Sequence, residues 1–209
     1  MTTVVYITLF VLIASVTIIS SYIVSKKVYL DEYSKKIKLD ITVEQMVDAE
    51  NRIKCFYLEN NLPSNASIWE IAKKLHIKDG GIDNQLTQQA HLSEPNLQGD
   101  MVVTFKNGLN VTRKIFNFAH ECAHVINNDP QPIDRPDGKN KSFTEQLADY
   151  TAAALLMPIN EVYDYLVEKK YNQLSPKKRV VLIKALCQQY EVSEVIALRR
   201  IKEIYEIKK

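Results

Sequence analysis

His120-Glu121-Cys122-Ala123-His124 is the stretch that decides the fold of this 209-residue chain. It lies within residues 111–127, where apolar side chains recur at near-helical spacing. Asn110 is placed to cap this helix at its start, and the polar run 127–130, which closes on a proline, ends it. The sequence therefore predicts that the five residues lie in the middle of a helix.

The two histidines of this motif are spaced to bind one metal ion. Residues four apart project from one face of a helix, so His120 and His124 can both reach an ion at about 2.0–2.1 Å. Glu121 projects about 100° further round the helix, toward the open coordination position of a catalytic zinc, where it can act as a general base. The alternative is a pair of ordinary surface histidines on an amphipathic helix. The pattern favours one Zn²⁺ ion and hydrolytic chemistry.

A third protein ligand is expected on the next helix, which is predicted over residues 143–157. Glu145 and Asp149 lie four residues apart on one face of it, and its alanines allow a close approach to the motif helix. Glu145 can complete the ligand set of three. Asp149 can accept a hydrogen bond from the far ring nitrogen of a ligand histidine and fix its tautomer. The alternative is that both carboxylates are solvated. His76 and His91 are isolated in sequence and are weaker ligand candidates.

The remaining pattern predicts an α+β fold that is mostly helical, with a small sheet. Residues 101–105 are β-branched and apolar and predict a short strand. Asp79-Gly80-Gly81 predicts a turn, and the polar stretch after it, up to residue 98, predicts loop or edge structure. Further helices are expected over residues 43–57, 68–75, 160–170, 176–190 and 193–207.

Composition limits the class of protein but names no partner. The net charge of +2 is too small to mark a nucleic-acid binder, so no direct nucleic-acid binding is expected. The three cysteines form no CxxC pair, which argues against a disulfide framework or a cysteine zinc site and favours a reducing compartment. Residues 169–209 hold 11 Lys and Arg against 4 Glu. Such a basic run is a solvated helical face, or it contacts anionic lipid or an acidic or DNA-bound partner.

An uncharged segment near the N-terminus sets the expected location. Residues 4–24 carry no charged side chain, and a helix of that length spans about 31 Å, close to the hydrocarbon thickness of a bilayer. Lysines follow directly, so the positive-inside rule places the rest of the chain in the cytoplasm. A cleaved signal peptide and a buried core helix are the alternatives. We expect a single-pass cell-membrane protein with an anchor at 1–25, a juxtamembrane connector at 26–40 and a cytoplasmic domain at 41–209.

Two segments together resemble a known family. The first is Phe116-Asn117-Phe118-Ala119-His120-Glu121-Cys122-Ala123-His124, and the second is Glu145-Gln146-Leu147-Ala148-Asp149-Tyr150-Thr151-Ala152-Ala153-Ala154-Leu155-Leu156-Met157-Pro158. They resemble the ImmA/IrrE-type metallopeptidases, and the similarity extends more loosely over residues 45–205. The resemblance implies a zincin-like metalloprotease domain in which His120, His124 and Glu145 bind zinc and Glu121 is catalytic. It also implies a protein substrate such as a helix-turn-helix transcriptional repressor.

These patterns predict a membrane-anchored, zinc-dependent endopeptidase. Glu121 would take a proton from water and pass it to the leaving amine, while Tyr150 or Tyr163 are candidate hydrogen-bond donors to the oxyanion. One alternative is a non-cleaving zinc-dependent sensor or regulatory scaffold that binds a repressor or another partner. Another is a membrane tether that acts without cleavage. Glu121 distinguishes the peptidase from the two non-cleaving alternatives, because a pure binding module has no use for a base beside the metal.

Overall fold

The computed structural model describes residues 37–39, 41–129 and 142–209. The expected membrane segment, residues 4–24, and most of the expected connector lie outside these described residues. Within the described ranges, no helix combines the length and the apolar character needed to cross a membrane. The anchor and the three-part division of the chain therefore stay predictions.

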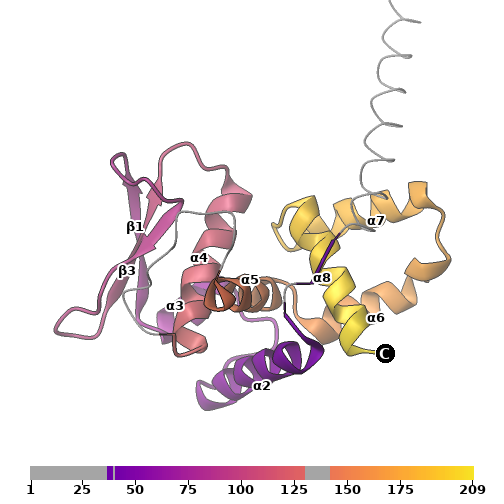
Figure 1. The fold of residues 1–209 in the computed structure, drawn as a ribbon, viewed down its shortest axis with the longest axis horizontal. Coiled ribbons are helices and arrows are strands. Elements are labelled where there is room, and N and C mark those ends of the chain that lie inside the picture. Colours follow the sequence, from indigo (N-terminus) through magenta and orange to yellow (C-terminus); the bar gives the residue numbers. More distant parts are fainter. Residues whose placement is uncertain (1–36, 40, 130–141) are drawn as a thin grey trace, which may run out of the picture.

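The described part of the chain is mostly helical and contains one small sheet. Its helices are α2 (Val43–Glu59), α3 (Ile68–Lys74), α4 (Val111–Ile126), α5 (Phe143–Leu156), α6 (Ile159–Glu168), the short η1 (Tyr171–Gln173), α7 (Pro176–Gln189) and α8 (Glu194–Ile207). Its strands are β1 (Ile77–Asp83), β2 (Ala90–Leu92) and β3 (Met101–Lys106). Figure 1 shows the sheet, α3 and α4 on one side of the molecule, α6 to α8 on the other, and α5 between them. This arrangement confirms the α+β, mostly helical class.

Polar residues set the starts of the helices that carry the site. The Asn110 side chain accepts a hydrogen bond from the backbone of α4, and the Ser142 side chain does the same for α5. Ser67 forms a capping box with Glu70 at the start of α3. These contacts satisfy amide groups that have no partner inside the helix. Each predicted helix accordingly begins and ends within two residues of the observed one.

The sheet has the order β1-β3-β2, with β3 parallel to β1 and antiparallel to β2. The prediction of a turn at Asp79-Gly80-Gly81 is wrong, because these residues lie inside β1. Gly80 packs so closely on β3 that a Cβ atom there would lie 2.3 Å from Cγ1 of Val102. Gly81 has a φ of 81° where the β1–β3 register shifts, between Asp79 and Ile82. The glycines thus permit close strand contact and a register shift, not a chain reversal.

Three hydrophobic clusters hold these elements together, and α5 contributes to more than one of them. The first cluster fills the space between the sheet, α3, α4 and α5, and it includes Ala148 and Ala152. The second is formed by α6, α7 and α8. The third joins α2 to α5 around Met46 and Tyr150. Because α5 is packed on several sides, its position against α4 is fixed, and the buried alanines bring the two helices close.

A buried charge network links the C-terminal helix to the rest of the domain. Arg200 of α8 is fully buried; its Nη2 donates to Oε1 of Glu50 at 2.7 Å and its Nε donates to the backbone oxygen of Met157 at 3.0 Å. The Tyr150 hydroxyl donates to the same Glu50 oxygen at 2.7 Å. Glu203, also buried, lies 3.9 Å from Nη1 of Arg200. One of the basic residues of the C-terminal region, Arg200, is therefore buried, and its contacts hold α8 against α2 and the end of α5.

Candidate metal centre

Helix α4 brings the two histidines of the motif to one point. His120 and His124 are both buried, the latter completely. Their Nε2 atoms lie 3.0 Å apart, and their rings meet edge to face with centroids separated by 4.7 Å. The spacing of four residues on a helix produces this convergence.

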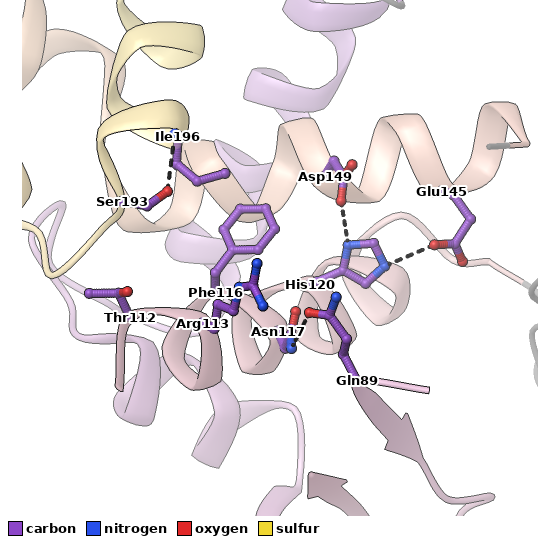
Figure 2. A pocket seen from close by; sticks show the side chains of 10 residues that line it. All are labelled: Gln89, Thr112, Arg113, Phe116, Asn117, His120, Glu145, Asp149, Ser193 and Ile196. Atoms are coloured by element: carbon purple, nitrogen blue, oxygen red, sulfur yellow. Dashed lines mark hydrogen bonds and ion pairs between the residues drawn. The ribbon is translucent and has the colours of Figure 1, made fainter. Parts of the chain in front are cut away.

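Glu145 reaches the same point from the first turn of α5. Its Oε2 lies 3.3 Å from Nε2 of His120, and its Oε1 lies 3.5 Å from Nε2 of His124. Figure 2 shows the His120 ring directed at this carboxylate. One nitrogen from each ring and one oxygen of Glu145 lie within 4.8 Å of one another. Among the described residues, this is the one such group of potential metal ligands.

Two further carboxylates contact the outer nitrogens of the two rings. Nδ1 of His120 lies 3.0 Å from Oδ1 of Asp149. A dashed line marks this contact in Figure 2. Nδ1 of His124 lies 2.8 Å from Oδ2 of Asp129. A carboxylate accepts the proton of Nδ1–H, so each contact holds the ring in the tautomer whose Nε2 lone pair faces the centre.

The atoms that this group brings together are of the kind that bind a metal cation. With both Nδ1 atoms protonated, the atoms that converge between α4 and α5 are two ring nitrogens with lone pairs and a carboxylate. A divalent cation between these atoms would be coordinated by all three side chains. The residues present therefore fit a single metal ion.

The electrostatics of the two rings favour the same conclusion. Burial by itself lowers the pKa of His120, but the neighbouring carboxylates of Asp149 and Glu145 favour a proton on the ring, outweigh burial and raise the pKa to about 9. Burial likewise opposes a charge on His124, but the carboxylates of Asp129 and Glu145 outweigh it, so that its pKa is raised. Carboxylates that favour a proton on these rings also favour a metal cation beside them.

A cleft of about 330 Å³ opens over this group. Residues of α4, α5 and the start of α8 line it, together with one residue next to β2: Gln89, Thr112, Arg113, Phe116, Asn117, His120, Glu145, Asp149, Ser193 and Ile196. In Figure 2 His120 and Glu145 lie on one side of the cleft, and Thr112 and Ser193 lie on the other. The buried histidine–carboxylate group is thus open to a molecule bound in the cleft.

Comparison with known families decides the assignment. The model of the IrrE N-terminal-like domain, a metallopeptidase family, matches residues 82–202, which include α4 and α5. The chain belongs to this family. None of the curated proteins compared with the chain matches it. A solved Mycobacterium tuberculosis transcriptional regulator is similar at 16% identity and a TM-score of 0.44, over 83% of this chain and 50% of the other. The chain therefore spans half the length of that regulator.

Within the IrrE-like domain, Glu121 lies deeper than the cleft surface. It is buried beside His120, and its negative charge contributes to the raised pKa of both motif histidines, which places it close to them. Its role as a base stays a prediction. Cys122, the next residue, packs into the first hydrophobic cluster, where burial raises the pKa of its thiol. That position therefore serves packing in this member of the family.

Other residues considered from the sequence lie away from the IrrE-like metal group. Tyr150 points toward α2, where its hydroxyl is engaged, and Tyr163 packs against the ring of a tyrosine of α8. Neither tyrosine lines the cleft, so neither is placed to donate to an oxyanion there. His76 and His91 are exposed, and neither belongs to the metal group.

Asp129 is the residue that sequence reasoning missed, since it assigned residues 127–130 only to the end of the helix. Asn128 adopts a left-handed φ of 58°, and its N–H bonds to the oxygen of Val125 at 3.1 Å. The N–H of Asp129 then bonds to the oxygen of His124 at 3.0 Å, which completes a Schellman turn. This turn folds the Asp129 carboxylate back onto the His124 ring. An Asn-Asp pair directly after the helix end was the available signal.

Proposed function

We propose that this chain is a membrane-anchored zinc endopeptidase that hydrolyses peptide bonds of a protein substrate. The convergence of His120, His124 and Glu145 beneath an open cleft is the observation that carries the proposal. Two nitrogens and one oxygen form the protein donor set of a catalytic zinc, which keeps a further position open, whereas a structural zinc has four protein ligands. Among the described residues the group has three such ligands.

The surrounding residues divide the work of peptide hydrolysis among them. The two histidines and Glu145 would hold the zinc ion, which would supply a Lewis acid for water and for the scissile carbonyl. Glu121 accepts a proton from the attacking water and delivers it to the amine that leaves. Asp129 and Asp149 hold the two imidazoles in the required tautomer and orientation.

The proposed substrate class follows from the resemblance to ImmA/IrrE-type peptidases. On that ground we infer that the substrate is a helix-turn-helix transcriptional repressor, whose cleavage would release the genes it silences. The open cleft supports a protein substrate, because a segment of peptide can lie along it over the metal group.

The proposed location rests on the sequence, because residues 4–24 are uncharged and lysines follow them. It can be tested with Leu97→Cys, since Leu97 is fully exposed, in a chain whose Cys55 and Cys187 are replaced by serine. A membrane-impermeant thiol reagent should label this cysteine in lysed cells but not in intact ones. Labelling in intact cells would place the domain outside the cell.

The experiment that tests the function compares two cell populations, one with the wild-type chain and one with Glu121→Gln. The two chains differ only in one carboxylate oxygen, which an NH2 group replaces, and they keep the same metal ligands. Both chains should therefore retain any binding partner. A protein that is lost, and replaced by fragments, only with the wild-type chain is the substrate. If both chains change the cell in the same way without fragments, the non-cleaving scaffold is the correct reading.

A further inference from the structure

Among the described residues that line the cleft, Arg113 is the one charged residue that neither belongs to the metal group nor contacts it. Of the other lining residues, His120 and Glu145 belong to the metal group, Asp149 contacts His120, and the remaining six are uncharged. We infer that Arg113 binds a carboxylate of the substrate, so that the enzyme selects acidic side chains near the bond it cuts. This inference rests on the proposed peptidase function and names the substrate chemistry of the same cleft.

Arg113 has no structural task that explains its presence. It is exposed, and no carboxylate in the described part of the chain pairs with its guanidinium. The next residue provides a contrast, because Lys114 pairs with Asp79 at 2.8 Å and lies 4.7 Å from the ring centre of Phe105. Lys114 therefore ties α4 to the sheet, whereas the charge of Arg113 is left for a molecule in the cleft.

The position of Arg113 along α4 also argues against a role in stabilising the helix. Its backbone N–H is the group that the Asn110 side chain caps, at 2.9 Å, so Arg113 lies in the first turn. The helix dipole makes the first turn unfavourable for a cation and favourable for an anion. α4 has no acidic residue in that turn. A substrate carboxylate beside Arg113 would meet both the guanidinium and the positive end of the helix.

Arg113 lies on the face of α4 that carries the metal ligands. Asn117, His120 and His124 follow it at intervals of four, three and four residues, which is the spacing of one helix face. Figure 2 shows Arg113, Asn117 and His120 in succession along the cleft. Seven residues of helix rise about 10.5 Å, and an extended peptide advances about 3.3 Å per residue. The selected carboxylate should therefore belong to a residue about three positions from the cleaved bond.

The chemistry of the pair makes the selection measurable. The planar fork of an arginine matches the two oxygens of a carboxylate, and such charge-assisted bonds are stronger than neutral ones. Phe116 and Ile196 line the same cleft and add apolar surface that the rest of a bound side chain can contact. Because the guanidinium is exposed, replacing the substrate carboxylate by an amide should lower kcat/KM about 2- to 5-fold.

The test uses the full-length chain, loaded with zinc and held in detergent micelles. A mixture of random peptides is digested, and the cut positions are read by mass spectrometry. For the wild-type chain, Asp and Glu should be enriched about three residues from the cut. Arg113→Gln should abolish this enrichment, and Arg113→Glu should replace it by Lys and Arg. Lys74→Gln, which removes an exposed cation of α3 outside the cleft, should leave the wild-type pattern.

The arms of the experiment separate this inference from the proposed function. Peptides with a free or an amidated C-terminus show whether the carboxylate comes from a side chain or from the chain end. A second readout is binding of a labelled acidic peptide and its amide analogue to Glu121→Gln, with and without Arg113→Gln. If the wild-type chain cleaves and Arg113→Glu keeps the same preference for acidic residues, the inference on Arg113 is wrong and the peptidase function stands. Equal binding of the acidic peptide and its amide analogue would also refute the inference on Arg113. If the wild-type chain cleaves no more than Glu121→Gln does, the peptidase function is refuted. The peptide-binding measurement then still decides whether Arg113 binds a carboxylate.

Discussion

Asp129→Asn should weaken zinc binding although Asp129 is not a predicted ligand. The Oδ2 atom of Asp129 lies 2.8 Å from Nδ1 of His124, and the ring is fully buried. The asparagine keeps an acceptor at this place but removes the charge that makes Nε2 of His124 a better donor to a metal. Loss of such a partner typically costs 10- to 100-fold in metal affinity, or about 1.4–2.7 kcal/mol. Asp129→Ala, which removes the acceptor as well, should cost more.

The assay is competition for zinc between the full-length chain and a chromogenic chelator at several chelator concentrations. Asp149→Asn provides the comparison on the other ring, where the contact is 3.0 Å and His120 is slightly less buried. Its loss of affinity should be no larger than that of Asp129→Asn. Asp164→Asn removes the same charge from an exposed position of α6 and should bind zinc as the wild type does.

One result would refute this reasoning. The backbone turn that places Asp129 does not depend on its side chain, because the N–H of Asp129 makes the bond to His124. The substitution therefore tests the carboxylate by itself. If Asp129→Asn and Asp129→Ala both bind zinc with wild-type affinity, the carboxylate only ends the helix and has no influence on the metal.

Three further substitutions test the ligand set and the packing. Glu145→Ala should empty the zinc site, whereas His91→Ala should keep one zinc per chain. Zinc content is measured after dialysis against a weak chelator, and the reverse result would exclude Glu145 as a ligand. Arg200→Met removes the buried cation that pairs with the half-buried Glu50 and leaves the buried Glu203 with Arg199 alone. It should lower the free energy of unfolding by about 3–5 kcal/mol in urea titrations, and an unchanged midpoint would contradict this. Gly80→Ala forces a methyl group against Val102 and should lower the free energy of unfolding by about 1–3 kcal/mol. Adding Val102→Ala should restore part of this stability in thermal unfolding. An unchanged stability of Gly80→Ala would mean that β1 and β3 are further apart.

The metal group was predictable because local periodicity encodes it. Two histidines four apart must share a helix face, and a glutamate early in the next helix needs only a close approach of α5 to α4. The buried alanines allow that approach, and Ala148 and Ala152 lie in the cluster between the helices. The distances among His120, His124 and Glu145 follow from these two conditions.

Other features depend on contacts that local patterns do not contain. β1 pairs through a glycine-containing segment whose extended conformation is imposed by β3, so its sequence alone reads as a turn. Arg200 pairs with Glu50, 150 residues away, and looked like one more charge on a basic helix. Asp129 meets His124 only because a left-handed residue reverses the chain. Partners that tertiary packing brings together are therefore the part that sequence reasoning misses.

Glu121→Gln in the purified full-length chain tests the central claim most directly. Zinc content per chain and the appearance of new amino termini from a peptide mixture are measured on the same samples of wild type and variant. We predict one zinc in both chains, because the ligands are unchanged, and a cleavage rate about 10²- to 10⁴-fold lower in the variant, because the base is lost. Equal cleavage by the two zinc-loaded chains would contradict the role of Glu121, and no cleavage by either would contradict the peptidase.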